Sequence, residues 1–418
     1  MDQNLAEPVP GEGARDVPIT VSSDTDSDRL PLADLTVIDV STLMAGPMAA
    51  RLLGDFGAQV IKVEHPSGDT LRRFGYSHRG VPLAWKVFNR NKKGIALDLS
   101  DARDKQEFLL LIERADVLIE NFRPGTLERW GLGPDVLAQR NPKLVITRVT
   151  CFGQDGPYAR RPGFGTIAEA MSGLSAMSGE PGGPPPLPPF PLGDALAGLH
   201  AACATMIALH ARGRIGRGQV ADVAITESVI GSLGAQFTVY DTLGIKPGGE
   251  GNQSPSNSPR NSYQCADGTW VAVSAAAQSI AERVLRLVGR GDLASEPWFA
   301  SGEGRAQHRD VIDAAVGGWI SARGRAEVIE SFENAQAAVA PVYDVADVLA
   351  DPHFTARKVA VNVPDPELGT VCMPNVPFQL SETPGSIRRA GPALDEHAEE
   401  IRAMLGQRQE RGQETPGQ

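Results

Sequence analysis

The sequence predicts an α/β protein built on a parallel, doubly wound sheet. Short apolar runs such as LTVIDV (35–40) alternate with helical stretches, and this order builds βαβ units. The hydrophobic content of 41% and the charged content of 22% are ordinary for a globular protein. A chain of 418 residues is long for one domain, so we expect two.

The first βαβ unit is expected directly after residue 30. LTVIDV predicts a buried strand, MAARLLGDFG (48–57) predicts a helix that ends at glycine, and AQVIKVE (58–64) predicts a second strand. The same alternation predicts strands at 95–99, 116–122 and 144–150, and helices at 101–114 and 125–138.

The second half of the chain predicts a helix over 195–210, then a strand and a helix within GQVADVAITESVIGSL (218–233). A loop at 245–262, a hairpin around Asp267-Gly268 and helices from about 278 to 335 follow. The expected organisation is a disordered segment at 1–30, a large domain at 31–225, a small domain at 226–340, a return to the large domain at 341–405, and a disordered tail at 406–418.

Composition argues against several classes of function. A formal net charge of −11 disfavours nucleic-acid binding, because neutralising phosphates needs basic surface. The four cysteines are far apart and have no metal-binding spacing, which favours reduced thiols, a cytoplasmic location and no metal site. The N-terminus lacks a secretory pattern, and no run of about 18 apolar residues indicates a membrane span.

Common cofactor and nucleophile motifs are missing from the sequence. The turn after the first strand offers only Gly46 followed by Pro47, where a dinucleotide fingerprint needs three glycines. There is no P-loop, and the nearest approach to a serine nucleophile elbow, at 173–177, lacks its last glycine. Nicotinamide, flavin and serine-hydrolase chemistry are therefore disfavoured.

Two stretches suggest a ligand site at the ends of parallel strands. The segment WKVFNRNKKG (85–94) carries Lys86, Arg90, Lys92 and Lys93, either as a solvated loop or as a phosphate-binding edge. The segment ENFRPGTLERWG (120–131) places an aromatic residue beside basic ones, a combination that suits a flat base and a phosphate.

A single carboxylate, Asp194, stands where the proline-rich stretch 181–191 gives way to a helix. One interpretation is a helix N-cap, which satisfies first-turn amides. The other is a residue presented for chemistry, and the local sequence leaves both open.

Eight stretches, taken in order, resemble the class III CoA-transferases (CaiB/BaiF family), which include formyl-CoA:oxalate, carnitine and succinyl-CoA-dependent transferases. The resemblance covers roughly residues 31–400. The stretches are AGPMAARLLGDFGAQVIKVEHPSGDTLR, NRNKKGIALDL, ADVLIENFRPGTLERWG, GPYARRPGF, AMSGL, LGDALAGLHA, GRGQVADVAITESV and APVYDVADVLADPHFTAR.

The resemblance implies a large Rossmann-like CoA-binding domain, a smaller α+β domain and an interlocked homodimer. It assigns Asp194 as the catalytic nucleophile, with Gly193 and Glu169 as possible accessories, and suggests that the loop at 248–252 covers the site. The positions implied to contact CoA or the acyl group are Leu43, Met44, His65, Leu97, Asn121, Phe122 and Arg129.

The implied reaction moves CoA from an acyl-CoA donor, with succinyl-CoA preferred, to a small carboxylic acid. It runs through an aspartyl anhydride and an enzyme-CoA thioester. CoA is a substrate here, and no tightly bound cofactor is expected. An unperturbed aspartate, with a pKa of about 3.9, is ionised at neutral pH without a general base. We expect Gly193 to leave room for the thioester and helix-start N–H groups to stabilise the oxyanion.

Two departures from the family pattern leave alternatives open. Many relatives have an aspartate after the aromatic residue that Phe164 matches, whereas this chain has Gly165, and Glu169 either serves nearby or faces solvent. The related α-methylacyl-CoA racemases carry a His-Asp pair there, which Phe164-Gly165 cannot replace. Met44 stands where formyl-CoA transferases have glutamine, which weakens a formyl assignment. The alternatives are a racemase-like enzyme and a non-catalytic CoA-binding subunit of a hetero-oligomer.

Overall fold

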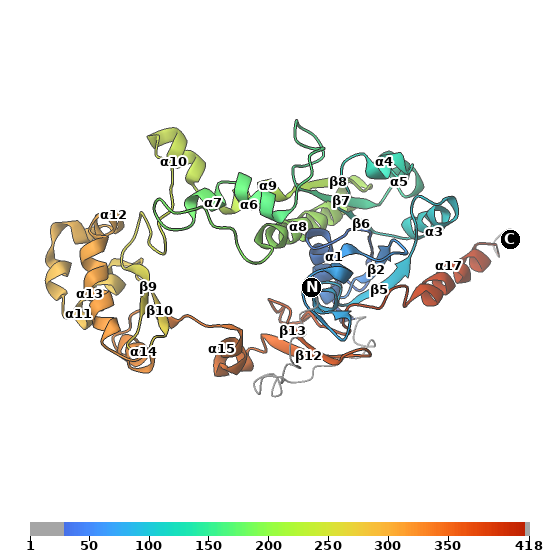
Figure 1. The fold of residues 1–418 in the computed structure, drawn as a ribbon. Helices are drawn as coiled ribbons and strands as arrows, with labels where there is room; N and C mark the ends of the chain where they lie inside the picture. The colour runs from blue at the N-terminus through green and yellow to red at the C-terminus, as the bar shows by residue number, and fades with distance from the viewer. Residues whose placement is uncertain (1–28, 414–418) are drawn as a thin grey trace. The chain divides into compact units, whose positions relative to one another are not determined.

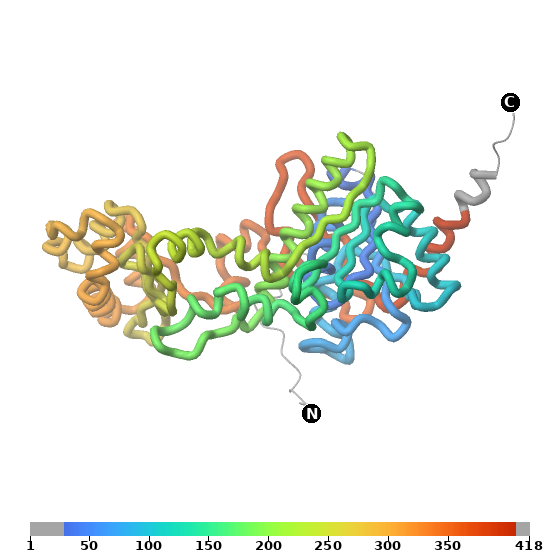
Figure 2. The backbone as a smooth tube through the Cα atoms, turned by 90° about the horizontal axis from the view of Figure 1, so that it is seen from above, coloured from blue at the N-terminus to red at the C-terminus, as the bar shows by residue number. Residues whose placement is uncertain are grey.

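The computed structural model describes residues 29–413, with side chains described through residue 406. The chain divides into two compact units. Among the described residues, unit 1 comprises 29–173, 187–234 and 349–413, and unit 2 comprises 174–186 and 235–348. The chain thus passes between the two units more than once, and Figure 2 lets the reader follow it by colour, from green through yellow to orange.

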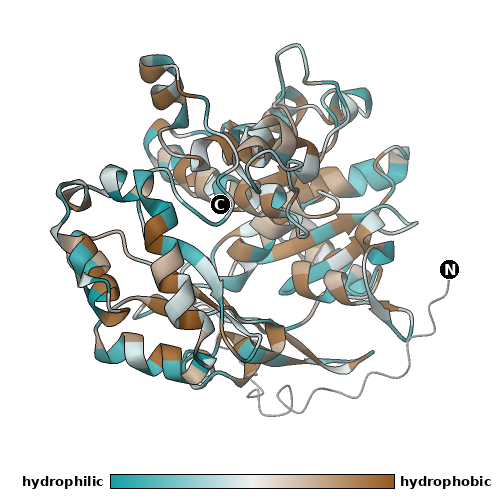
Figure 3. Ribbon diagram, turned by 60° about the vertical axis from the view of Figure 1, so that its left-hand side comes forward, coloured by the Kyte–Doolittle hydropathy of each residue, from teal (hydrophilic) through white to brown (hydrophobic). Residues whose placement is uncertain are grey.

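A six-stranded sheet in the order β5-β2-β1-β6-β7-β8 forms the centre of unit 1, and every pairing in it is parallel. The predicted parallel sheet is therefore confirmed (Figure 1). Apolar residues, brown in the hydropathy colouring, recur along its strands (Figure 3). The strands are β1 (Thr36–Asp39), β2 (Gln59–Glu64), β5 (Lys92–Ala96), β6 (Val117–Glu120), β7 (Val145–Thr150) and β8 (Val220–Ala224).

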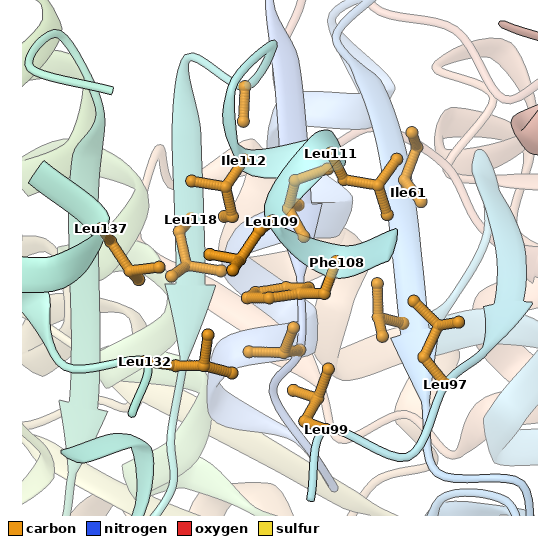
Figure 4. Packing of buried hydrophobic residues seen from close by; sticks show 14 of the residues in the cluster. Ile61, Leu97, Leu99, Phe108, Leu109, Leu111, Ile112, Leu118, Leu132 and Leu137 are labelled. Atoms are coloured by element: carbon orange, nitrogen blue, oxygen red, sulfur yellow. The ribbon is translucent and has the colours of Figure 1, made fainter. Parts of the chain in front are cut away.

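Helices cover both faces of this sheet, as a doubly wound fold requires. On one face, α3 (Ala102–Ile112), α5 (Pro134–Arg140) and α17 (Ala398–Gln413) share a core cluster with alternate strand residues. Phe108 lies at the centre of this packing, beside Leu99 and Leu118 (Figure 4). On the other face, α1 (Ala45–Asp55) contacts β1 and β2, and α8 (Leu192–Ile215) contacts β7 and β8.

The remaining elements of unit 1 are short. A hairpin of β12 and β13 packs its own apolar cluster against Phe56. The elements are η3 (Thr70–Arg73), β3 (Ser77–His78), β4 (Val81–Pro82), α2 (Leu83–Phe88), α4 (Thr126–Arg129), α6 (Gly165–Met171), α9 (Ile225–Ser232), α16 (Pro352–Ala356), β12 (Ala360–Asp365) and β13 (Gly369–Pro374), with α15 (Val345–Ala350) at the unit boundary.

Unit 2 is an α+β unit around a three-stranded antiparallel sheet, and the hairpin expected at Asp267-Gly268 joins its first two strands. Its core lies between this sheet and three longer helices, α11, α13 and α14. The elements are α7 (Leu174–Met177), α10 (Gln236–Leu243), β9 (Arg260–Gln264), β10 (Trp270–Ser274), α11 (Gln278–Leu287), η4 (Gly291–Ser295), η5 (Pro297–Ala300), α12 (Gly302–Gln307), α13 (Arg309–Ser321), α14 (Arg325–Asn334) and β11 (Val339–Pro341).

Several expected boundaries differ from the structure. Unit 2 begins at residue 235 rather than 226, because α9 packs against α6 and α8 of unit 1. The stretch 174–186 also belongs to unit 2. The expected disordered tail is wrong for 406–413, where α17 continues. The segment 29–34 forms a turn, in which the Leu32 N–H bonds to the Phe56 carbonyl, and residues 1–28 and 414–418 lie outside the described residues.

Among the described helices, only α8 is long and apolar enough to cross a bilayer by length and composition. It packs along α1, α6, α9 and two strands of the sheet. A core helix passes the same composition test, so α8 does not indicate a membrane span.

Candidate active site

Asp194 lies in the first turn of α8, and it is not the cap of that helix. The cap position is Pro191, and the Ala195 N–H makes the first helical bond, to the Pro191 carbonyl. A proline at the helix start costs nothing, because an N–H there has no intrahelical partner. The helix therefore starts at Leu192 rather than at residue 195, its cap residue makes no side-chain cap bond, and the N-cap interpretation is wrong.

Two glycines bring the starts of α6 and α8 together around the Asp194 carboxylate. A Cβ on Gly165 would lie 2.4 Å from Asp194 Oδ2, and a Cβ on Gly193 would lie 2.9 Å from the Gly165 carbonyl oxygen. The Gly165 backbone N–H favours the ionised form of this carboxylate. Gly193 therefore makes room for the backbone of α6, and the expectation that it also makes room for the thioester stays a prediction.

Glu169 on α6 is a buried partner of this site. Its side chain is only 1% exposed, and Oε1 accepts a hydrogen bond from the Gly193 N–H at 2.8 Å. Glu169 is therefore buried beside Asp194 and does not face solvent. The N–H groups of Gly193 and Ala195 both donate to acceptors within the protein, and the expectation that helix-start N–H groups stabilise an oxyanion stays a prediction.

Burial and then the neighbouring Glu169 charge raise the pKa of Asp194 to about 6, against the opposing hydrogen bond from the Gly165 N–H. At pH 7 about nine in ten Asp194 carboxyls are still ionised. A raised pKa also makes a carboxylate more basic and therefore a better nucleophile. Burial and the Asp194 charge together raise the pKa of the Cys151 thiol to about 11, so Cys151 stays protonated at neutral pH.

The start of α1 meets α8 one helical turn beyond Asp194. A Cβ on Gly198 would lie 3.0 Å from the Ala45 carbonyl oxygen, so the start of α1 packs directly on α8. Met44 is the cap residue of α1, and Leu43 before it has a φ of +60°. The structure therefore brings the predicted positions Leu43 and Met44 to the same end of α8 as Asp194.

A pocket of about 130 Å³ opens at the carboxyl ends of β1, β2 and β5, where open parallel sheets bind their ligands. Three predicted positions, His65, Leu97 and Phe122, line it together with Thr42 and Asp69. The Phe122 ring packs edge-on against Trp130, with centroids 5.2 Å apart. The side chain of His65 is 59% exposed, and its Nδ1 lies 2.7 Å from Ser67 Oγ.

Two other predicted positions are not in the lining of this pocket. Both polar atoms of the Asn121 amide bond to the backbone of Thr42. Arg129 is exposed at the end of α4, where its Nη2 donates to Thr126 Oγ1 at 3.0 Å.

The basic segment 85–94 is neither a solvated loop nor a phosphate-binding edge, so both interpretations are wrong. Lys86 pairs with Asp365 at 2.8 Å, Arg90 with Asp55 at 2.6 Å and Lys92 with Asp39 at 2.8 Å, and all six side chains are at most 2% exposed. A buried charge needs such a partner. Lys93 pairs with Glu400 on α17.

Sequence reasoning missed a buried charge network beside the pocket. The Lys62 ammonium lies 3.5 Å from Asp69 and 3.8 Å from Asp39, and it donates to the Ser41 carbonyl. Burial lowers the pKa of Lys62, but Asp39, Asp69 and Glu64 outweigh burial and raise it. The sequence did offer a signal for this network, because Asp39 and Lys62 are charged residues within the apolar stretches TVID and QVIKVE. Among the described residues, no group of three His, Cys, Asp or Glu side chains is arranged to hold a metal ion.

A model of CoA-transferase family III matches residues 32–398. The chain belongs to that family. It is 42% identical to the succinyl-CoA–L-malate CoA-transferase beta subunit of Chloroflexus aurantiacus, over 92% of this chain and 96% of that protein. It is 39% identical to the succinyl-CoA–D-citramalate CoA-transferase of the same organism, over 89% and 93%. The fold resembles the crystal structure of a CAIB/BAIF family protein from Brucella suis, with a TM-score of 0.80 and 31% identity over 90% of this chain and 100% of that chain.

Family membership fixes the general class of reaction. This CoA-transferase acts on CoA thioesters, and the family resemblance drawn from the sequence motifs is confirmed.

Proposed function

We propose that this CoA-transferase moves CoA from succinyl-CoA to a small carboxylic acid, with Asp194 as the covalent nucleophile. The observation that carries the proposal is the placement of Asp194. Its carboxylate is largely buried in the first turn of α8, where Gly165 leaves space for it. One turn further along α8, Gly198 meets Ala45, the residue directly after Leu43 and Met44. Asp194 is thus a carboxylate held in one position, where proximity supplies much of the rate.

In the first step an Asp194 carboxylate oxygen attacks the thioester carbon of the donor. The carbon–sulfur bond breaks, CoA leaves as its thiolate, and a mixed anhydride remains on Asp194. The thiolate then attacks the aspartyl carbonyl and releases the donor acid as its carboxylate. The acceptor carboxylate repeats both steps in reverse, and no net proton transfer is needed.

Glu169 has a positioning role in this proposal. Its bond to the Gly193 N–H fixes the first turn of α8, and its charge raises the pKa of Asp194. The pocket lined by His65, Leu97 and Phe122 is the proposed place of the CoA adenine end. The exposed Arg129, outside this lining, is also proposed to contact CoA. Leu43 and Met44 are proposed to lie beside the thioester.

Succinyl-CoA is the proposed donor because relatives at 42% and 39% identity carry it in their names. Those names also pair it with malate or citramalate, so we propose a short di- or hydroxydicarboxylic acid as the acceptor. A racemase-like activity is disfavoured by Gly165, which offers no base for an α-proton.

We also propose that the protein is a cytoplasmic homodimer. Its four free cysteines fit a reducing compartment. Large apolar side chains are exposed on α8 and α10, including Ile207 at 63%, Phe237 at 67% and Leu243 at 65%. Single exposed apolar side chains are normal on a soluble monomer, but several on one helix indicate an interaction surface. A second copy of the chain is the proposed cover.

The test is a donor and acceptor panel, followed by chromatography of the CoA thioesters. Succinyl-CoA with malate, citramalate or mesaconate should give the new thioester and free succinate. Exchange of the α-proton of a branched acyl-CoA in D₂O, without transfer, would establish the racemase instead. CoA binding without either reaction would support a non-catalytic subunit of a hetero-oligomer. One relative is itself named as a beta subunit.

A further inference from the structure

The loop of residues 41–44 is held in an unfavourable backbone conformation beside the active site. Leu43 has a φ of +60°, a left-handed region that a branched non-glycine residue rarely adopts. Such strain persists only where the surroundings enforce it, and it concentrates at functional sites. The contacts that enforce it therefore indicate which residues the site depends on.

Two side chains from other elements clamp the backbone of this loop. Asn121, directly after β6, accepts from the Thr42 N–H through Oδ1 and donates to the Thr42 carbonyl through Nδ2, both at 2.7 Å. Asp69, the cap of η3, accepts from the Leu43 N–H at 3.2 Å and from the Leu71 N–H at 2.9 Å. Two consecutive peptide units are thus fixed from outside the loop.

The second clamp is anchored by a buried cation. The Asp69 carboxylate lies 3.5 Å from Lys62 Nζ, which also donates to the Ser41 carbonyl at the start of the loop. Lys62 and Asp69 are each 1% exposed at the side chain, so solvent does not weaken the pair. Lys62 therefore holds both the loop and the residue that clamps it.

The clamped loop connects the two parts of the proposed site. Thr42 lines the pocket, and Ala45, directly after the loop, contacts α8 at Gly198, one turn from Asp194. We infer that Asn121 and Asp69 are positioning residues, which hold the loop of residues 41–44 so that a thioester bound against it meets the Asp194 carboxylate. The amide of Asn121 then acts on the protein backbone, and a direct contact to CoA is not its role. This inference rests on the proposed function.

The test compares Asn121→Ala with Asn141→Ala. Asn141 is a matched control, because its amide also makes two backbone bonds in unit 1, to the carbonyls of Ile112 and Ala115, but it lies between α5 and β7 rather than directly after β6. Both variants should lose similar stability. Asn121→Ala should lower kcat by about 10- to 100-fold with KM for the CoA thioester changed less than about threefold, since a misplacement of about 1 Å costs on that order. Asn141→Ala should keep kcat and KM.

Asp69→Asn is the second variant, because it keeps an oxygen for the Leu43 N–H and removes only the charge that faces Lys62. It should also lower kcat and leave KM nearly unchanged. A rise in KM of tenfold or more at unchanged kcat for Asn121→Ala would overturn the inference and make Asn121 a direct CoA contact. Wild-type kinetics in both Asn121→Ala and Asp69→Asn would also overturn the inference. Wild-type enzyme that binds CoA but transfers nothing would instead refute the proposed function, and the inference with it.

Discussion

Replacing Asp194 with asparagine should abolish transfer and stabilise the fold. The pKa of Asp194 is raised to about 6, well above the ordinary aspartate value of about 3.9, so ionising it in the folded protein costs free energy. A shift of about two units corresponds to about 3 kcal/mol at neutral pH. Asparagine keeps the shape and an oxygen for the Gly165 N–H, and it removes the repulsion from Glu169.

The sign of the pH dependence makes this prediction specific. Because the folded pKa is raised, the protonated carboxyl contributes stability below the unfolded pKa of about 4, and that contribution is lost as pH rises to about 6. Asp194→Asn should therefore match the wild type near pH 4 and exceed it by about 2 to 3 kcal/mol at pH 7. Urea denaturation at both pH values measures the difference.

The matched control is Asp155→Asn, which neutralises an exposed carboxylate in unit 1 and should change stability by less than about 0.5 kcal/mol. The reasoning would be refuted if Asp194→Asn were no more stable than wild type at pH 7, or if the gain were as large at pH 4. Either result would mean that the carboxylate is not strained by burial and by Glu169.

Four further predictions follow from the same geometry. The kcat/KM for the acyl-CoA should fall about tenfold per pH unit below about 6, because only ionised Asp194 attacks; a flat profile down to pH 5 would argue against it. Glu169→Gln keeps an acceptor for the Gly193 N–H and removes a charge, so the acid limb should move to lower pH, and an unmoved limb would separate Glu169 from the pKa of Asp194. Gly165→Ala should lower kcat by about 100-fold, because the added methyl group displaces the Asp194 carboxylate. The control Gly213→Ala, on α8 with open space around it, should leave kcat unchanged, and equal effects of the two variants would refute the steric argument. Leu243→Asp on α10 should shift the protein toward monomer in light scattering, and an unchanged mass would exclude α10 from the interface.

The fold was predictable where the apolar pattern was simple. LTVIDV and AQVIKVE became β1 and β2, because continuous apolar runs suit strands that are buried on both faces. The start of β5 was missed, because Lys92 and Lys93 look like surface residues, although Lys92 is fully buried against Asp39. A buried ion pair joins residues distant in sequence, and periodicity carries no signal for it.

The site was predictable only through the family resemblance. Local rules left open whether Asp194 is a helix cap, and the structure excludes the cap because Pro191 already occupies that position. The pairing of Asp194 with Gly165 and Glu169 depends on two helix starts meeting in space, which no local pattern encodes. The clamp of Asn121 on Thr42 likewise joins the ends of two different strands.

The most direct test of the central claim is to trap the covalent intermediate. The protein is incubated with succinyl-CoA, quenched with hydroxylamine, digested and read by tandem mass spectrometry. Attack of hydroxylamine on an aspartyl anhydride or thioester should leave a hydroxamate on Asp194, dependent on succinyl-CoA and lost in Asp194→Asn. An unmodified Asp194 peptide from an enzyme that is turning over, or a hydroxamate on another carboxylate, would contradict the account.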